Sequence, residues 1–163
     1  MIDNTSDIAY IAGFLDGDGS IMLQLKPRRD YVMGFQIKAT IAFYQRTDNR
    51  SILDWLQARL KVGRIRERND GISQYDIEGL RPVQSVLELL IPYLVLKKQQ
   101  AVIAAGLIRE MLPVDKPSPE QFLQWAKSVE EFQALNYSKK AKHGYNEVLA
   151  FLDGMRDRSP RND

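Results

Sequence analysis

Apolar positions recur along this chain with two different periods, and each change of period marks a predicted element. Near the start, Ile8, Ile11, Ala12 and Leu15 recur at helical spacing. From Phe35 onward, apolar and polar residues alternate strictly, which is typical of a half-buried strand. The pattern predicts, in order, a helix over 6–17, strands over 21–26 and 35–45, a helix over 49–60, strands over 62–68 and 73–78, and helices over 81–90, 97–111, 118–135 and 145–155.

Helices and strands follow one another in segregated pairs, in the order α-β-β-α-β-β-α with further helices after them. Strands that do not alternate singly with helices favour an antiparallel sheet, so the predicted fold class is α+β. The length of 163 residues suits one domain, which we expect over residues 1–156. Residues 157–163 are predicted to form a polar tail.

Composition excludes several classes of protein. The chain has no cysteine, so disulfides and thiolate zinc sites are absent. No apolar run approaches the roughly 20 residues of a membrane span. The start lacks a basic region before an apolar one, so we expect no secretory signal.

Charge is distributed unevenly along the chain. Residues 20–68 hold 11 Lys or Arg and 4 acids, a net charge of +7, whereas the remainder carries −5. Such polarity is expected of a protein that binds a polyanion. The predicted strands also share an outer face of forked donors and acceptors that can read base edges in a DNA major groove, which we favour over an ordinary solvent-facing sheet. These residues are Gln24, Lys26, Gln36, Lys38, Arg64, Arg66, Arg68, Gln74 and Asp76.

The acidic run Asp16-Gly17-Asp18-Gly19-Ser20 follows the first helix directly. A calcium loop does not fit, because the required glycine and glutamate positions are Ile21 and Pro27. Two interpretations stay open: a glycine-rich helix end, and a magnesium-type site for phosphodiester cleavage. In the second, Ala9, Gly13 and Gly17 form a small-residue stripe along which two copies of the helix could pack, bringing two Asp18 side chains together.

The segment from Tyr10 to Ser20, followed by two strand pairs, resembles the single-motif branch of the LAGLIDADG homing endonucleases, the homodimeric type encoded in organellar group I introns. Further segments carry the same resemblance, which covers nearly the whole chain. They are 24–27, 45–47, 92–101, 118–119 with 122–123, and 134–136 with 138–139. The resemblance implies a LAGLIDADG fold with a curved antiparallel DNA-binding sheet.

The resemblance also implies roles for single residues. Asp18 and the Gly17 carbonyl would bind the metal, Gln45 would orient solvent, and Lys97 would stabilise charge near the scissile phosphate. A further basic residue of the family is replaced here by Asn49, and Arg50 beside it could substitute. Asp16 would be mainly structural. The helix would meet its partner through Ala9, Ala12, Gly13, Asp16 and Gly17.

The implied function is site-specific cleavage of a long, near-palindromic double-stranded DNA by a homodimer that uses Mg²⁺, with Mn²⁺ or Ca²⁺ as possible occupants of the site. No membrane or small-molecule partner is expected, and a chloroplast or another organelle is the implied location. The alternative is an intron RNA-binding splicing cofactor or a DNA-binding protein that does not cleave. Expected DNA contacts are the nine strand residues named above with Arg28, Asp30, Tyr31, Tyr44, Ser138, Lys139, Lys140, Lys142 and His143.

Overall fold

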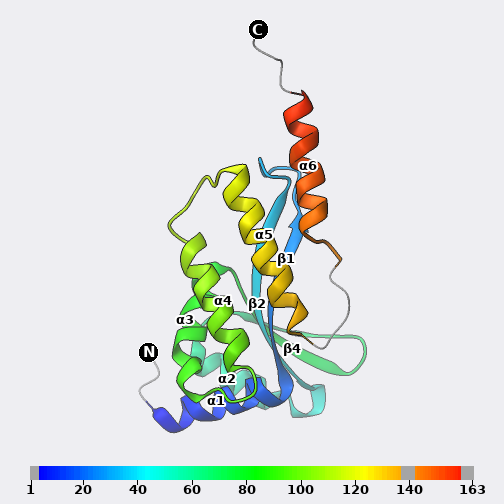
Figure 1. The fold of residues 1–163 in the computed structure, drawn as a ribbon. Coiled ribbons are helices and arrows are strands. Elements are labelled where there is room, and N and C mark those ends of the chain that lie inside the picture. The colour runs from blue at the N-terminus through cyan, green and yellow to red at the C-terminus, as the bar shows by residue number, and fades with distance from the viewer. Residues whose placement is uncertain (1–3, 137–141, 159–163) are drawn as a thin grey trace. The chain divides into compact units, whose positions relative to one another are not determined.

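The computed structural model describes residues 4–136 and 142–158, so Ser138, Lys139 and Lys140 lie outside the described residues. Its elements follow the predicted order (Figure 1). They are α1 (Thr5–Asp18), β1 (Gly19–Pro27), β2 (Phe35–Arg46), the short 3-10 helix η1 (Thr47–Asn49), α2 (Ser51–Leu60), β3 (Arg64–Glu67), β4 (Ile72–Glu78), α3 (Leu80–Leu90), η2 (Ile91–Tyr93), α4 (Lys98–Met111), α5 (Pro119–Ala134) and α6 (Tyr145–Arg158).

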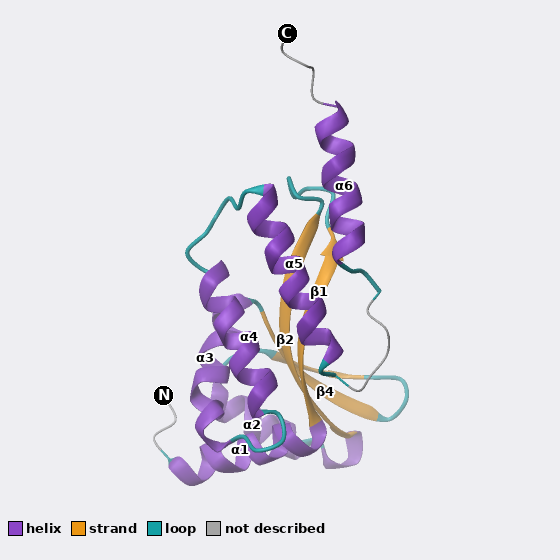
Figure 2. Cartoon of the chain, viewed as in Figure 1, coloured by secondary structure: helices purple, strands orange, loops and turns teal. Residues whose placement is uncertain are grey.

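The four strands form one sheet in the order β1-β2-β4-β3. Strand β4 pairs antiparallel with both β2 and β3, so that Gln74 lies between Tyr44 on one side and Arg66 on the other. The α+β class predicted from the sequence is therefore confirmed. Figure 2 shows α3 beside α4 and α5 beside α6.

The chain groups into two compact units. The first comprises residues 1–22 and 39–112, and the second comprises residues 23–38 and 113–163. Strands β1 and β2 contribute residues to both. In the first unit, Phe43 and Tyr75 stack at 5.6 Å between ring centroids in a core that contains Ile11 and Leu15. In the second unit, Phe35 contacts Phe151 of α6 edge to face at 6.1 Å.

The boundaries of α1 have identifiable causes. Asn4 caps the helix, one residue before the helix starts, because its side chain accepts a hydrogen bond from the Ser6 backbone N–H at 3.0 Å. The helix passes through Gly13 and Gly17 and ends at Gly19. A Cβ atom at Gly19 would lie 2.9 Å from the Ala42 carbonyl oxygen, so glycine lets the end of α1 pack directly on β2.

The polar face of the central strands is less open than the alternation predicts. Thr40, Gln74 and Asp76 are all buried. Long side chains of the edge strand β3 lie across this face: the Arg64 guanidinium is 3.6 Å from Glu78, and that of Arg66 is 3.4 Å from Asp76. An alternating pattern identifies the face to which a residue belongs but not what covers that face.

Candidate active site and DNA-binding surface

Asp18 stands at the end of α1, on a side of the helix that its own unit leaves open. It is the last residue of the helix and is exposed. With Tyr10, Gly13, Phe14 and Gly17 it lines an open groove of about 370 Å³. A Cβ atom added at Gly13 or Gly17 would meet no heavy atom of the described residues within 4 Å. Packing within the described residues therefore gives no reason for glycine at either position.

The donors at this end of α1 are hard oxygen atoms, which suit Mg²⁺ or Ca²⁺. Asp18 supplies a carboxylate, and Gly17 lies in the last helical turn, where backbone carbonyls lack partners within the helix. Among the described residues, no three His, Cys, Asp or Glu side chains gather closely enough to hold a metal ion. One chain therefore supplies only part of the ligands that such an ion needs. A second carboxylate or phosphate oxygens would complete the coordination shell.

Asp16, two residues earlier, has a different role. Its carboxylate accepts hydrogen bonds from the backbone N–H groups of Val95 at 2.8 Å, Leu96 at 3.1 Å and Lys97 at 2.9 Å. Partial burial alone would raise the pKa of Asp16, but these three donors and the Lys97 charge outweigh it and lower that pKa. Asp16 therefore fixes the turn at 95–97, which agrees with the structural role that the resemblance implies.

Lys97 ties this turn to the end of α1. Its ammonium group donates to the Asp16 carbonyl oxygen at 2.5 Å, at the negative end of the α1 dipole. Burial lowers the pKa of Lys97, while the charges of Asp16 and Asp18 act in the opposite direction. Lys97 lies at the N-terminus of α4, where the dipole of that helix disfavours a cation. The negative end of the α1 dipole offsets this unfavourable interaction.

Gln45 lies near the end of β2, opposite Ser73 of β4. Its side-chain oxygen accepts from the Arg46 backbone N–H at 2.9 Å, which fixes the orientation of the amide. Ala42, which Gly19 approaches closely, precedes Gln45 by three residues. Three residues of strand span roughly 10 Å, so β2 carries Gln45 from the end of α1 toward the rim of the sheet.

Arg50, the residue that could substitute for the family's further basic group, has acidic partners on two elements. Its guanidinium donates to Glu67 of β3 at 2.6 Å and to Asp54 of α2 at 3.5 Å. The hydrogen bond to Glu67 is the largest cause that raises the pKa of Arg50. Arg50 therefore ties the start of α2 to β3. Asn49 beside it is exposed.

The predicted interface residues on α1 divide into two groups. Ala9, Gly13 and Gly17 are exposed, as a contact surface requires. Ala12 is 0% exposed and belongs to the core, so the prediction that its side chain meets a partner is wrong. Asp16 turns its carboxylate toward its own chain, as described above.

Base-reading candidates in the first unit form a connected cluster on β3 and β4. The Asp76 side chain, 4% exposed, accepts from the Gln74 amide at 2.6 Å. Arg66 donates to the Gln74 oxygen at 3.1 Å and pairs with Asp76 at 3.4 Å. This corrects the prediction that Asp76 reads a base directly: it holds Gln74 and Arg66 in place. Tyr44 is half-buried beside the cluster, and Arg68 pairs with Asp70 of the hairpin turn at 2.6 Å.

A second cluster occupies the 28–36 loop of the other unit. Arg28 binds both oxygens of Asp30, at 2.9 and 2.8 Å, donates to Gln36 at 3.1 Å, and stacks 5.0 Å from the Tyr31 ring centroid. The hydrogen bond from Arg28 is the main cause that lowers the pKa of Asp30 to about 2. Gln24, Lys26 and Lys38 are half-buried, Lys142 is exposed, and His143 contacts Glu147 at 2.7 Å.

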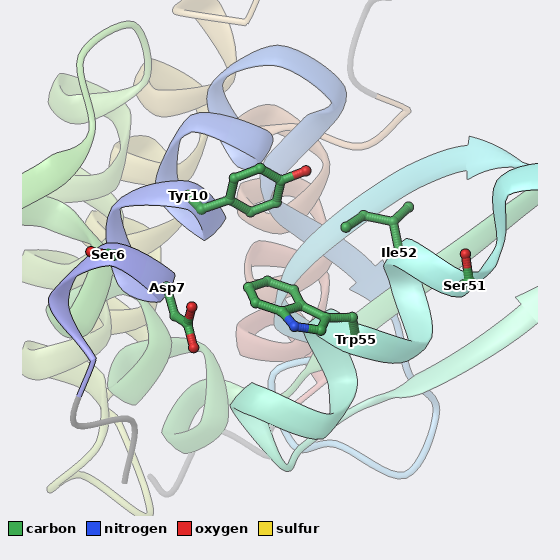
Figure 3. Close-up of a pocket in the computed structure, with 6 residues that line it drawn as sticks. All are labelled: Ser6, Asp7, Tyr10, Ser51, Ile52 and Trp55. Atoms are coloured by element: carbon green, nitrogen blue, oxygen red, sulfur yellow. The ribbon is translucent and has the colours of Figure 1, made fainter.

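Two apolar features near α1 lie outside the predicted site. Val95 and Leu96 are 86% and 72% exposed, although Asp16 holds their backbone. Trp55 of α2 and Tyr10 border a second pocket with Ile52 (Figure 3). Each feature could have been noticed in the sequence. Val95 and Leu96 are two adjacent apolar residues between predicted helices, and Trp55 does not lie on the apolar face of its predicted helix.

Comparison with known proteins places this geometry in context. Residues 11–104 match the family described as LAGLIDADG endonuclease. The chain is 37% identical over 155 residues to DNA endonuclease I-CreI of Chlamydomonas reinhardtii, which covers 95% of this chain and 94% of that protein. It is also 37% identical over 110 residues to DNA endonuclease I-CvuI of Chlorella vulgaris, 68% of each chain.

Solved structures agree with this assignment. The crystal structure of I-CvuI in complex with the I-CreI target, with Mg present and the DNA not cleaved, superposes with a TM-score of 0.87 at 32% identity, covering 93% of this chain and 95% of that one. The archaeal intron-encoded endonuclease I-Vdi141I in complex with DNA has a TM-score of 0.82 at 20% identity, over 93% of this chain and 97% of that one, which supports the fold alone. The chain belongs to the LAGLIDADG endonuclease family.

Proposed function

We propose that this protein is a site-specific endonuclease that cleaves double-stranded DNA as a homodimer, in the manner of intron homing. The observation that carries the proposal is the exposed Asp18 at the end of a groove that Gly13 and Gly17 keep open. A second α1 in that groove would bring two carboxylates together and complete a site that one chain leaves half-built. The relatives support the chemistry, because I-CreI and I-CvuI are named DNA endonucleases.

In the proposed mechanism, each chain contributes the same set of groups to one strand cut. Asp18 and the Gly17 carbonyl would hold Mg²⁺, which supplies Lewis-acid polarisation of the phosphate and activation of water. Lys97, fixed by the end of α1, stabilises charge that develops on the phosphate and leaving oxygens. Gln45, its amide held by Arg46, orients the solvent network that delivers the attacking water.

Two-fold symmetry of the protein predicts an approximately palindromic target. In each half-site, Arg66 of the β3–β4 cluster is the donor placed to read a guanine, because Asp76 and Gln74 fix its position. The 28–36 loop offers Arg28 in the same prearranged state. Lys142 and His143 are proposed phosphate contacts.

Structures of I-CvuI were obtained with Mg and with Ca, which indicates use of a divalent metal by that relative. We propose Mg²⁺ as the working ion here and an algal or similar organelle, such as the chloroplast, as the location, since both curated relatives come from green algae. Each helix within residues 4–136 and 142–158 is too short or too polar to cross a membrane.

Selection of cleaved duplexes from a randomised DNA pool in the presence of Mg²⁺ tests the proposal. The wild type should enrich one near-palindromic sequence and cut both strands. On that duplex, Asp18→Asn should bind but lose cleavage by about a thousandfold or more, since the metal-binding charge is removed. Asp115→Asn, which changes an exposed carboxylate in the loop before α5, is the matched control and should cleave normally. A wild type that binds DNA of the pool yet yields no cleaved duplex would refute the nuclease.

A further inference from the structure

Gly34 is the last residue before the 28–36 loop enters β2. Its φ of +73° is one that a residue with a side chain rarely adopts. Gly34 also closes the loop in both directions. Its N–H donates to the Tyr31 carbonyl oxygen at 2.8 Å, and its own carbonyl oxygen accepts from the Arg28 N–H at 2.8 Å. The position of Gly34 therefore determines where the backbone of Arg28 lies.

The ring of Phe151, from α6, lies directly against Gly34. A Cβ atom at Gly34 would lie 2.5 Å from two atoms of this ring and 2.8 Å from a third, so only glycine allows so close an approach. Phe35, the next residue, meets the same ring edge to face, with 6.1 Å between the ring centroids. Phe151 therefore contacts both residues through which the loop joins β2.

Helix α6 is itself fixed within the same unit, beside α5 (Figure 1). Val148 and Leu152 of α6 are buried. The backbone N–H of Tyr145, the first residue of α6, donates to the Glu130 carboxylate of α5 at 2.9 Å. Phe151 is nevertheless 42% exposed, so its ring is not a central part of the core. A well-anchored helix thus holds a partly exposed ring against the base of one loop.

We propose that Phe151 is a positioning residue for DNA recognition: through Gly34 it holds the backbone of Arg28 where the guanidinium can read a base. A forked donor discriminates between bases only while it is held within about 0.5 Å of the productive geometry. Asp30 and Gln36 fix the guanidinium within the 28–36 loop, whereas Phe151 fixes the loop on α6. This inference rests on the proposed function, because it names a residue on which base reading by the loop depends.

Hydrogen exchange of the protein without DNA, followed by NMR, gives the first test. In Phe151→Ala, the Arg28 and Gly34 amides should exchange about tenfold faster than in the wild type, because the ring no longer supports the turn that their hydrogen bonds close. Val129→Ala, which removes a fully buried side chain of α5 in the same unit, is the matched control. It should lower global stability but leave these two rates unchanged, because the loop amides exchange by local opening. Unchanged rates in Phe151→Ala would overturn the proposal.

Two glycine substitutions measure the same contact from its other side. Gly71→Ala adds a Cβ atom at a φ of +79° with no heavy atom within 4 Å, so only backbone strain should lower the melting temperature, by about 3 °C. Gly34→Ala adds similar strain and also a collision with the Phe151 ring, and should lower the melting temperature by about twice as much. In the Phe151→Ala background, Gly34→Ala should cost only as much as Gly71→Ala, because the space is then free. Equal losses for the two single glycine changes would contradict the contact.

Cleavage rates on a panel of single-substitution targets test the role in recognition. Arg28→Gln identifies the base pairs that the loop reads, as those at which it changes discrimination. Phe151→Ala should reduce discrimination about tenfold at the same base pairs and leave the others unchanged. Phe151→Leu, which refills part of the space, should restore most of the loss, and Val129→Ala should change none of these values. A loss spread evenly over all base pairs, or no loss, would overturn the positioning role.

The outcomes separate this inference from the proposed function. A wild type that cleaves, with exchange rates unchanged in Phe151→Ala, would overturn the positioning role alone. A wild type that binds DNA without cleaving it would refute the nuclease alone, and binding affinities for the same panel would then decide the role of Phe151. A wild type that neither binds nor cleaves DNA would overturn both proposals.

Discussion

The turn at 95–97 and the loop at 28–36 are each organised by an aspartate, but the two carboxylates hold different kinds of group. Asp16 receives three backbone N–H groups from the turn. Asp30 receives the forked side chain of Arg28, which also reaches Gln36. Both carboxylates have a lowered pKa. A lowered pKa alone thus does not distinguish an acid that fixes the fold from one that prepares a binding surface.

What distinguishes them is whether the donors can find other partners. Backbone N–H groups beside Asp16 cannot turn away without moving the chain, whereas an exposed guanidinium can rotate into water. Asp76 is an intermediate case, because it is buried but holds side chains, those of Gln74 and Arg66. The comparison therefore predicts that stability falls most on loss of Asp16, less on loss of Asp76 and least on loss of Asp30.

Asp16→Ala should give the largest effect, a loss of about 3 kcal/mol in the free energy of unfolding, since hydrogen bonds to a charged acceptor disappear and leave donors unpaired. Urea denaturation at neutral pH measures it. Because the folded-state pKa lies below the ordinary 3.8, the stabilisation is present above that value and is lost as pH falls through the folded pKa. Acid titration of the wild type should show this loss, and the alanine variant should not.

A fall of less than about 0.5 kcal/mol for Asp16→Ala would contradict the comparison, because that is the range of ordinary surface changes. Asp48→Ala serves as the control, since Asp48 pairs with Arg46 through an exposed salt bridge with side chains 77% and 71% exposed. It should change stability little.

The two acids of the motif show how far the sequence could lead. Periodicity identified α1 and the four strands, because a helical or alternating pattern is local. The roles of Asp16 and Asp18 could not be separated by pattern, since the donors of Asp16 lie 79 to 81 positions away. The same reason explains Arg50, whose partner Glu67 is 17 positions away on another element. Alternation placed Asp76 on the outer, polar face of β4, but Arg66, whose guanidinium lies 3.4 Å from it, comes from the neighbouring strand.

Asp76→Ala should have an intermediate effect, about 1 kcal/mol of stability. Its clearer result should be in DNA recognition: freed from Asp76, Arg66 is no longer held in one position, so discrimination at the base pair it reads should fall about tenfold. Cleavage rates on a panel of single-substitution targets measure this. Asp70→Ala, which releases Arg68 at the hairpin turn, is the control and should change a different base pair or none. Unchanged discrimination everywhere for Asp76→Ala would refute its positioning role.

The smallest effect on stability should come from the exposed loop. Arg28→Gln should leave the free energy of unfolding unchanged within about 0.5 kcal/mol. It should nevertheless raise the Asp30 pKa from about 2 toward its ordinary value of 3.8, because the Arg28 hydrogen bond is the main cause of the lowering. Carbon-13 NMR of the Asp30 carboxyl, titrated from pH 6 downward, follows both proteins. The lowered pKa means that the Arg28–Asp30 contact is complete above pH of about 4 and is lost as pH falls through about 2. If the Asp30 carboxyl of the wild type titrated with a midpoint near 3.8, Arg28 would not hold Asp30 in the free protein. Asp16 and Asp30 would then differ only in how far each is buried, and not in the kind of donor that holds them.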